Sequence, residues 1–155
     1  MKHLLSISTL YPTALRPRFG IFVQSSLEAL AKRGDWRVTV INPLGVPPIA
    51  FGRYKPLTTL APFNEAGGVA IHRPRFTLIP KLGAARNPAA IVKAVLPLAQ
   101  EIHARTPVDV VDAQFFYPDG PAAAMIARAL GVPHAIMARG SDIIVWGKKI
   151  LPAAR

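Results

Sequence analysis

The chain has 155 residues, about half of them hydrophobic and 17% charged, which is the composition of one globular domain and excludes a disordered segment. It has no cysteine, which excludes disulfides and thiolate metal sites, and its apolar runs are too short for a membrane span or a signal-peptide core, so we expect a cytoplasmic protein. Nineteen Lys and Arg against eight Asp and Glu give a net charge of +11, which attracts phosphates, nucleic acid or anionic lipid.

The first forty residues predict a strand, a helix and a second strand. Residues 3–8 are an apolar strand candidate, and a loop with two prolines and two arginines follows up to Gly20. Residues 21–33 have apolar side chains at helical spacing before Gly34, and residues 37–42 are rich in β-branched side chains. This order is typical of a parallel βαβ unit.

The middle segment, residues 43–87, is less regular and contains seven prolines. Gly67 and Gly68 predict a turn before a short strand at 69–73. Cationic side chains alternate here with apolar and aromatic ones, and two interpretations remain open. The segment is either a proline-rich excursion that packs on the sheet, with its cations in solvent, or a surface that rests on anionic lipid.

A long helix is predicted to begin at Asn87, as the N-cap, with Pro88 next to it. Its buried stripe falls at helical spacing, and Pro97 inside it predicts a kink. The stripe consists of Ile91, Val95, Leu98 and Ile102.

The remaining segment, residues 108–142, predicts a second βαβ unit. Residues 108–113 form a strand, Asp119 is an N-cap candidate for a helix over 122–130, and residues 134–138 form another strand. Ligands of parallel sheets bind beyond the carboxyl ends of the strands. We therefore expect residues 114–120 and 139–142 to share one functional rim.

The candidate chemistry of this rim is that of an anion or polyol site. Asp119 could cap its helix or bind a ligand hydroxyl, and Asp142 could cap a helix near residue 143 or bind a sugar. Arg139 could bind a phosphate or form an ion pair with Asp142. The four histidines have no metal-ligand spacing, and a Gly-x-Ser-x-Gly elbow is absent, so neither a metal site nor a serine hydrolase is predicted.

Gly20 stands between the first strand and its helix, where helix N–H groups can bind an anion. Taken alone, it is interpreted as a turn glycine. The surrounding sequence matches neither Gly-x-Gly-x-x-Gly nor the P-loop pattern, which argues against a dinucleotide dehydrogenase and a P-loop NTPase.

Several of these segments together resemble the amino-terminal domain of family 4 glycosyltransferases. The resemblance covers nearly the whole chain in the right order. Its segments are Leu10-Tyr11-Pro12 with Gly20, residues 27–34, residues 38–40, residues 111–120 and residues 138–142. Many members of that family have His-Gly-x-Asp where this chain has Arg139-Gly140-Ser141-Asp142.

The resemblance implies an α/β fold, a Rossmann-like three-layer sandwich with a mostly parallel sheet, as one half of a GT-B fold. It implies a retaining hexosyltransferase that moves a sugar from a nucleotide-sugar donor to a lipid-linked or polysaccharide acceptor without a metal or other cofactor. Residues 1–155 would be the acceptor-binding domain. The donor domain with its glutamate pair is not in the sequence, so we expect this chain alone to be inactive.

The same resemblance assigns roles to individual residues, without naming a catalytic one. The loop at Gly20 and Ile21 would face the donor diphosphate. The acceptor would contact Asp119, Gly120, Arg139, Ser141 and Asp142.

The partners expected from the resemblance are the nucleotide sugar, the acceptor and the anionic inner face of a membrane. The alternative is a non-catalytic basic module that binds anionic membranes or polyanions. Nucleic acid is not expected, because the basic residues follow no recognised motif.

Overall fold

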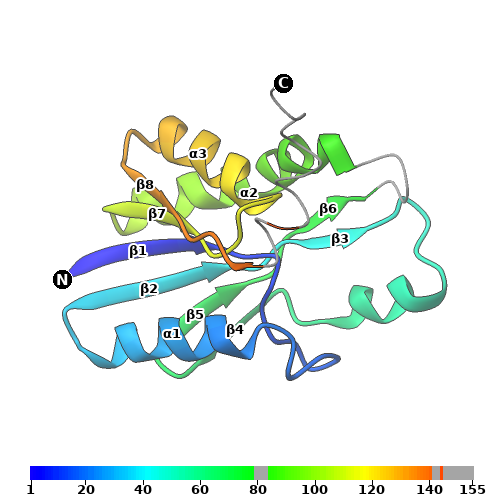
Figure 1. Cartoon of the computed structure of the whole chain (residues 1–155), viewed down its shortest axis with the longest axis horizontal. Helices are drawn as coiled ribbons and strands as arrows, with labels where there is room; N and C mark the ends of the chain where they lie inside the picture. Colours follow the sequence, from blue (N-terminus) through cyan, green and yellow to red (C-terminus); the bar gives the residue numbers. More distant parts are fainter. Residues whose placement is uncertain (79–83, 141–143, 145–155) are drawn as a thin grey trace.

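A computed structural model describes residues 1–78, 84–140 and 144, and its centre is a six-stranded sheet (Figure 1). All neighbouring strands are parallel except the edge strand β4, which is antiparallel to β5. The order across the sheet is β4 (Phe63–Ala66), β5 (Val69–His72), β2 (Trp36–Ile41), β1 (Lys2–Ile7), β7 (Val110–Ala113) and β8 (His134–Ile136).

Helices cover both faces of the sheet. Helix α1 (Ile21–Lys32) lies on one face, and α2 (Asn87–Arg105) and α3 (Asp119–Leu130) lie together on the other (Figure 1). The predicted fold is therefore confirmed: this is a Rossmann-like α/β sandwich with a mostly parallel sheet. The central strands read as continuous apolar runs because both of their faces are buried.

Two apolar clusters form the core, one on each side of the sheet. Successive residues of β1 supply both, since Leu4 packs on the α1 side and Leu5 packs under α2 and α3. Ile91 and Val95, from the predicted stripe of α2, are fully buried. This arrangement leaves the carboxyl ends of β1, β7 and β8 free to form a site.

The irregular middle segment contains more structure than the sequence predicts. Strands β3 (Leu44–Val46) and β6 (Arg75–Thr77) continue β2 and β5 past Pro43 and Pro74 as a separate parallel pair. The Leu44 N–H donates to the Pro74 carbonyl at 2.9 Å, so hydrogen bonding between the two chain segments continues across the prolines. Two short 3₁₀ helices, η1 (Gly52–Thr59) and η2 (Ala84–Arg86), complete the segment.

Several predicted boundaries are wrong. Strand β4 is absent from the prediction, although the Gly67–Gly68 turn that joins it to β5 is present, with φ of 60° and 79°. Asn87 is not an N-cap, because η2 leads directly into α2 and Asn87 is already helical. Asp119 is likewise the first residue of α3 and not its cap. Helix α2 continues through Pro97 to Arg105.

Candidate functional site

Arg139 is the best-anchored residue of the predicted rim. It follows β8, and its guanidinium lies 4.5 Å from the ring centroid of Phe22, in the first turn of α1. Its Nε donates to the Gln114 carbonyl at 3.1 Å and its Nη2 donates to Gln114 Oε1 at 2.9 Å. One side chain therefore joins the ends of β7 and β8 to the start of α1 and places a guanidinium at the strand ends.

Behind Arg139 lies a short polar chain. Gln114 is buried, and its Nε2 donates to Asp112 Oδ2. Burial raises the pKa of the Asp112 carboxyl, while Gln114 and the charge of Arg139 act in the opposite direction. Gln114 thus couples an inner carboxylate to an outer guanidinium. The sequence signal for it is weak: Gln114 is one polar residue directly after a buried strand.

Asp119 and Gly120 lie behind the rim. The Asp119 side chain is fully buried, and its Oδ2 accepts the Thr9 N–H at 2.9 Å, which fastens α3 to the loop after β1. A Cβ on Gly120 would lie 3.2 Å from Ile136 Cδ1, so this glycine permits close packing of α3 on β8. Their predicted contact with an acceptor stays a prediction.

Gly20 occupies a position that its surroundings restrict to glycine. Its φ is +75°, and a Cβ there would lie 2.7 Å from the carbonyl carbon and oxygen of Leu10. Its carbonyl accepts the N–H groups of Val23 and Gln24, and the exposed Ile21 follows. The turn-glycine interpretation therefore has a geometric basis. A role towards a donor diphosphate remains a prediction.

The structure brings the loop at Gly20 and Ile21 next to Arg139, because the Arg139 guanidinium stacks on the ring of Phe22, the following residue. Two other predicted site residues, Ser141 and Asp142, lie outside the described residues. Within residues 1–78, 84–140 and 144, no three His, Asp or Glu side chains gather as metal ligands. In the same ranges, no helix has the length and apolar character needed to cross a membrane.

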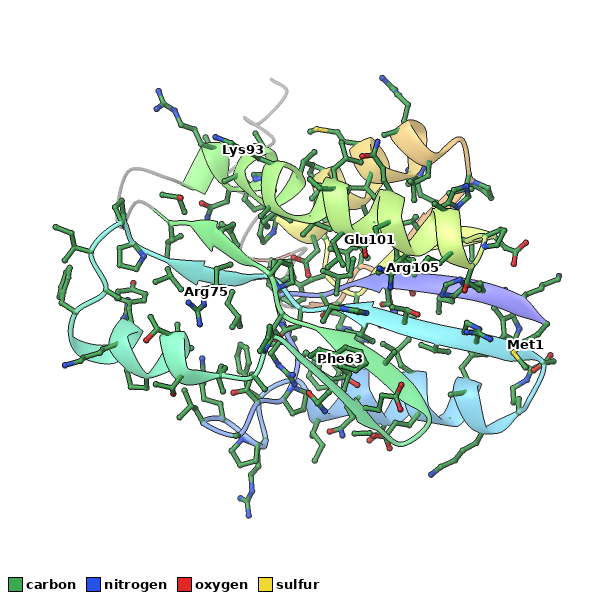
Figure 2. All side chains as sticks on the ribbon, turned by 180° about the vertical axis from the view of Figure 1, so that it is seen from behind. Met1, Phe63, Arg75, Lys93, Glu101 and Arg105 are labelled. Atoms are coloured by element: carbon green, nitrogen blue, oxygen red, sulfur yellow. The ribbon has the colours of Figure 1, made fainter. Side chains whose placement is uncertain are left out.

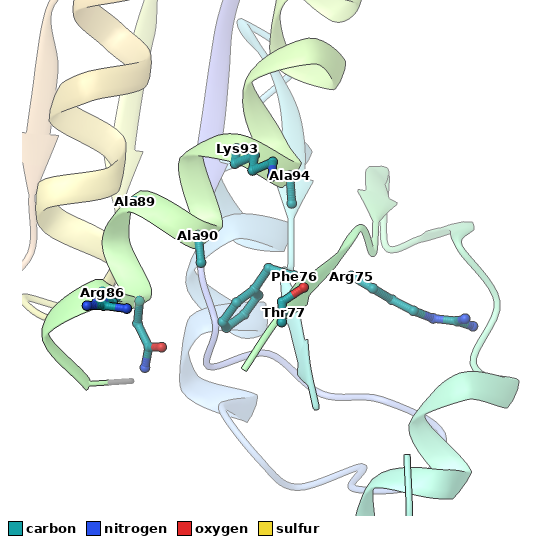
Figure 3. A pocket seen from close by; sticks show the side chains of 9 residues that line it. Arg75, Phe76, Thr77, Arg86, Ala89, Ala90, Lys93 and Ala94 are labelled. Atoms are coloured by element: carbon teal, nitrogen blue, oxygen red, sulfur yellow. The ribbon is translucent and has the colours of Figure 1, made fainter. Parts of the chain in front are cut away.

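Two cavities lie on this side of the molecule, one close to the rim and one farther from it. One of about 290 Å³ lies at the ends of β1 and β2, where the Arg16 guanidinium is 3.8 Å from the ring centroid of Phe19. A larger hollow of about 670 Å³ lies between β6 and the start of α2, with Phe76 among its lining residues (Figure 3). Arg75, Arg86 and Lys93 also line it, so it is basic.

Comparison with known proteins finds a glycosyltransferase that is similar to this chain. No family model matches the chain. The chain is 26% identical over 147 residues to the putative teichuronic acid biosynthesis glycosyltransferase TuaC of Bacillus subtilis (strain 168), which covers 92% of this chain. The chain spans 37% of the length of that relative. It thus resembles a glycosyltransferase over nearly its full length.

Two solved structures share the fold. The apo UGT2 of Phytolacca americana has a TM-score of 0.54 at 13% identity, over 89% of this chain and 29% of that one. The carboxy-terminal domain of the PF1911 hydrogenase from Pyrococcus furiosus has a TM-score of 0.50 at 12% identity, over 87% and 89% of the two chains. At such identities the likeness concerns the Rossmann-like fold alone.

Proposed function

We propose that this chain is the acceptor-binding half of a retaining family 4 glycosyltransferase with a GT-B fold. The enzyme would move a hexose from a nucleotide sugar to a polysaccharide or a lipid-linked acceptor. The observation that carries this proposal is the similarity to TuaC across 92% of the chain. The cationic rim at the strand ends supports it, since ligands of parallel sheets bind there.

In this proposal each part of the rim has a physical task. Arg139, held by Gln114 and stacked on Phe22, pairs with a phosphate or with hydroxyl oxygens of the acceptor. The amino-terminal end of α1 after Gly20 faces the donor diphosphate, which its dipole favours. A donor-binding domain outside these 155 residues holds the nucleotide.

The proposed reaction breaks the bond between the anomeric carbon and the diphosphate oxygen and forms a bond to an acceptor oxygen on the same face. The acceptor hydroxyl proton leaves with the departing diphosphate, and no metal is required. Because the name of TuaC refers to teichuronic acid biosynthesis, we infer a polyanionic acid polymer of that kind or its lipid-linked precursor as the acceptor.

A panel of nucleotide sugars tests the proposal. Hydrolysis and transfer are measured with the chain alone and with the chain joined to the protein encoded immediately downstream. We expect turnover only in the joined sample. Turnover by the 155 residues alone would overturn the assignment of an acceptor half.

A second candidate function, a basic module on anionic membranes, is favoured by the surface around η1. Ile49 and Phe51 are 79% and 64% exposed just before η1, which carries Arg53 and Lys55. Arg75 reaches from β6 to this helix and donates to the Thr58 carbonyl (Figure 2). Exposed apolar side chains among cations are typical of an interfacial surface at the inner face of a membrane.

Vesicle flotation together with the turnover measurement separates the two candidates. The membrane module requires binding to phosphatidylglycerol vesicles, none to phosphatidylcholine vesicles, and a loss of binding in the variant F51S/K55E. The matched variant L15S/K32E changes the same residue kinds elsewhere and should retain binding. Vesicle binding with no turnover in either nucleotide-sugar sample would favour the membrane module over sugar transfer.

A further inference from the structure

A cavity of about 400 Å³ opens between the loop after β1, strand β4 and the end of β5. It lies apart from the rim at Arg139, towards the opposite edge of the sheet, where β4 and β5 lie. Its polar lining comes from the loop after β1, from α1, from β4 and from the residue that follows β5. These lining residues are Tyr11, Thr13, Gln24, Asn64 and Arg73.

Arg73 is the charged group of this cavity, and its partners are neutral. Its Nη1 donates to Asn64 Oδ1 and its Nη2 donates weakly to the Pro12 carbonyl at 3.4 Å. The Nε is buried and has no hydrogen-bond partner. The ion pairs of the described residues, Arg33–Asp35 and Arg105–Glu101, do not include it.

The contacts of the Arg73 guanidinium do not fully compensate for the burial of its charge. Burial lowers the pKa of Arg73, which means that its surroundings disfavour the charged form. A partly buried cation is normally paired with a carboxylate, because neutral hydrogen-bond acceptors only partly replace its hydration. Arg73 therefore has unused capacity to bind a negative charge.

Tyr11 adds a second unused donor. Its side chain is 2% exposed, it lines the cavity, and its buried hydroxyl has no hydrogen-bond partner. Burial raises the pKa of Tyr11 to about 12, so the hydroxyl keeps its proton at neutral pH. Buried hydroxyls without a partner are rare in native proteins and call for an explanation.

Glu28 is the acidic residue that acts on this region. Its charge contributes to the raised pKa of Tyr11, but its carboxylate accepts the Gln24 amide at 2.8 Å and does not line the cavity. Glu28 therefore does not neutralise Arg73 by contact. Its field should weaken the binding of any anion, which provides a test.

We propose that this cavity binds the oxyanion, a carboxylate or a phosphate, of a small hydroxylated ligand. The Arg73 guanidinium pairs with the oxyanion, the Tyr11 hydroxyl donates to it, and Thr13 and Gln24 face the remainder of the ligand. A volume of about 400 Å³ fits a ligand of monosaccharide size. The inference uses none of the rim residues and does not depend on sugar transfer.

The test is a calorimetric titration of the 155-residue chain with glucuronate, glucose 6-phosphate and glucose. We expect at least one anion to bind about tenfold or more tightly than neutral glucose, since charged hydrogen bonds are stronger than neutral ones. The tighter of the two anions identifies the oxyanion. Equal binding of all three sugars, or no binding at all, would overturn the proposal.

Variants locate the binding site. Y11F removes only the hydroxyl and should weaken anion binding several-fold without lowering the midpoint of thermal unfolding, because no internal hydrogen bond is lost. Y54F removes a hydroxyl elsewhere and should change nothing in the titration. E28Q should tighten binding, and R73Q should abolish it. Unchanged affinity in a folded R73Q protein, or a loss in Y54F equal to that in Y11F, would refute the site.

Discussion

At the scale of single residues, both the backbone conformation of Gly20 and its backbone neighbours disfavour a side chain. G20A places a side chain at φ +75° and 2.7 Å from the Leu10 carbonyl, and should reduce the free energy of unfolding by about 2–4 kcal/mol. G34A is the matched control, since its φ is +80° but nothing lies within 4 Å, and should lose only about 1 kcal/mol. Urea denaturation measures both. Equal losses would show that contact with Leu10 is unimportant.

The hydrogen bond from the Thr9 N–H to Asp119 should stabilise the contact between α3 and the loop after β1. D119A leaves the Thr9 N–H without its acceptor inside the protein and should lower stability by about 2–3 kcal/mol. D119N retains an oxygen that can accept this N–H and should lose clearly less. Urea titrations of the two variants would contradict this account if the asparagine variant proved as unstable as the alanine variant.

One buried and one partly buried histidine, His3 and His72, should make stability depend on pH. Burial is the main reason that the pKa values of His3 and His72 are lowered from 6.5. Between the unfolded value and the lower folded value, the unfolded chain binds more protons, so stability is complete above about pH 6.5 and falls as the pH decreases through this window. Unfolding free energies measured along a pH series should show this decline. H3Q should flatten it, and an unchanged slope in H3Q would exclude His3 as a source.

The positions of some functional residues can be predicted from the sequence, but their contacts cannot. Arg139 is placed correctly at a strand end, because the topology of a βαβ unit determines which loops share a rim. Its contacts with Gln114 and Phe22 could not be predicted, since each residue belongs to another element and the contacts exist only after the sheet has formed. The cavity at Arg73 could not be predicted either, because its lining residues come from several elements that meet only in the folded chain.

At the scale of elements, Pro97 is a local defect of α2. It is exposed inside a helix of 19 residues and cannot donate the N–H that a helical residue normally provides. P97A should therefore raise the free energy of unfolding by about 1–3 kcal/mol. The urea midpoint tests this, and P88A should show no such gain, because Pro88 is buried and a proline at the helix start is compatible with the fold. A lower midpoint in P97A would show that Pro97 favours the native packing.

Elements with a clear apolar pattern are predictable here, and the strands among the prolines are not. Helices α1, α2 and α3 follow from apolar side chains at helical spacing, and strands β1, β2 and β7 follow from continuous apolar runs. Strands β3, β4 and β6 have three or four residues each and lie among prolines, so their own sequence has little signal. Strands β3 and β6 form because β2 and β5 extend the pairing past Pro43 and Pro74, and β4 forms because the turn at Gly67 and Gly68 returns the chain alongside β5.

At the scale of the whole molecule, the net charge of +11 opposes the compact state. The two ion pairs within the described residues, Arg33–Asp35 and Arg105–Glu101, have exposed side chains and offset little of this repulsion (Figure 2 shows the second pair on α2). Raising sodium chloride from about 20 mM to about 0.5 M screens the repulsion and should raise the midpoint of thermal unfolding. A lower midpoint at high salt would mean that attractive pairs dominate.

The most direct test of the central claim is an amide-resolved NMR titration of this 16.7 kDa chain. The probes are a panel of neutral, uronate-containing and phosphate-containing oligosaccharides and, separately, a panel of nucleotide sugars. An acceptor-binding half predicts that an oligosaccharide shifts the amides of Gln114, Arg139 and the first turn of α1, while nucleotide sugars bind weakly or not at all. Tight binding of a nucleotide sugar, or oligosaccharide shifts that avoid this rim, would contradict the account.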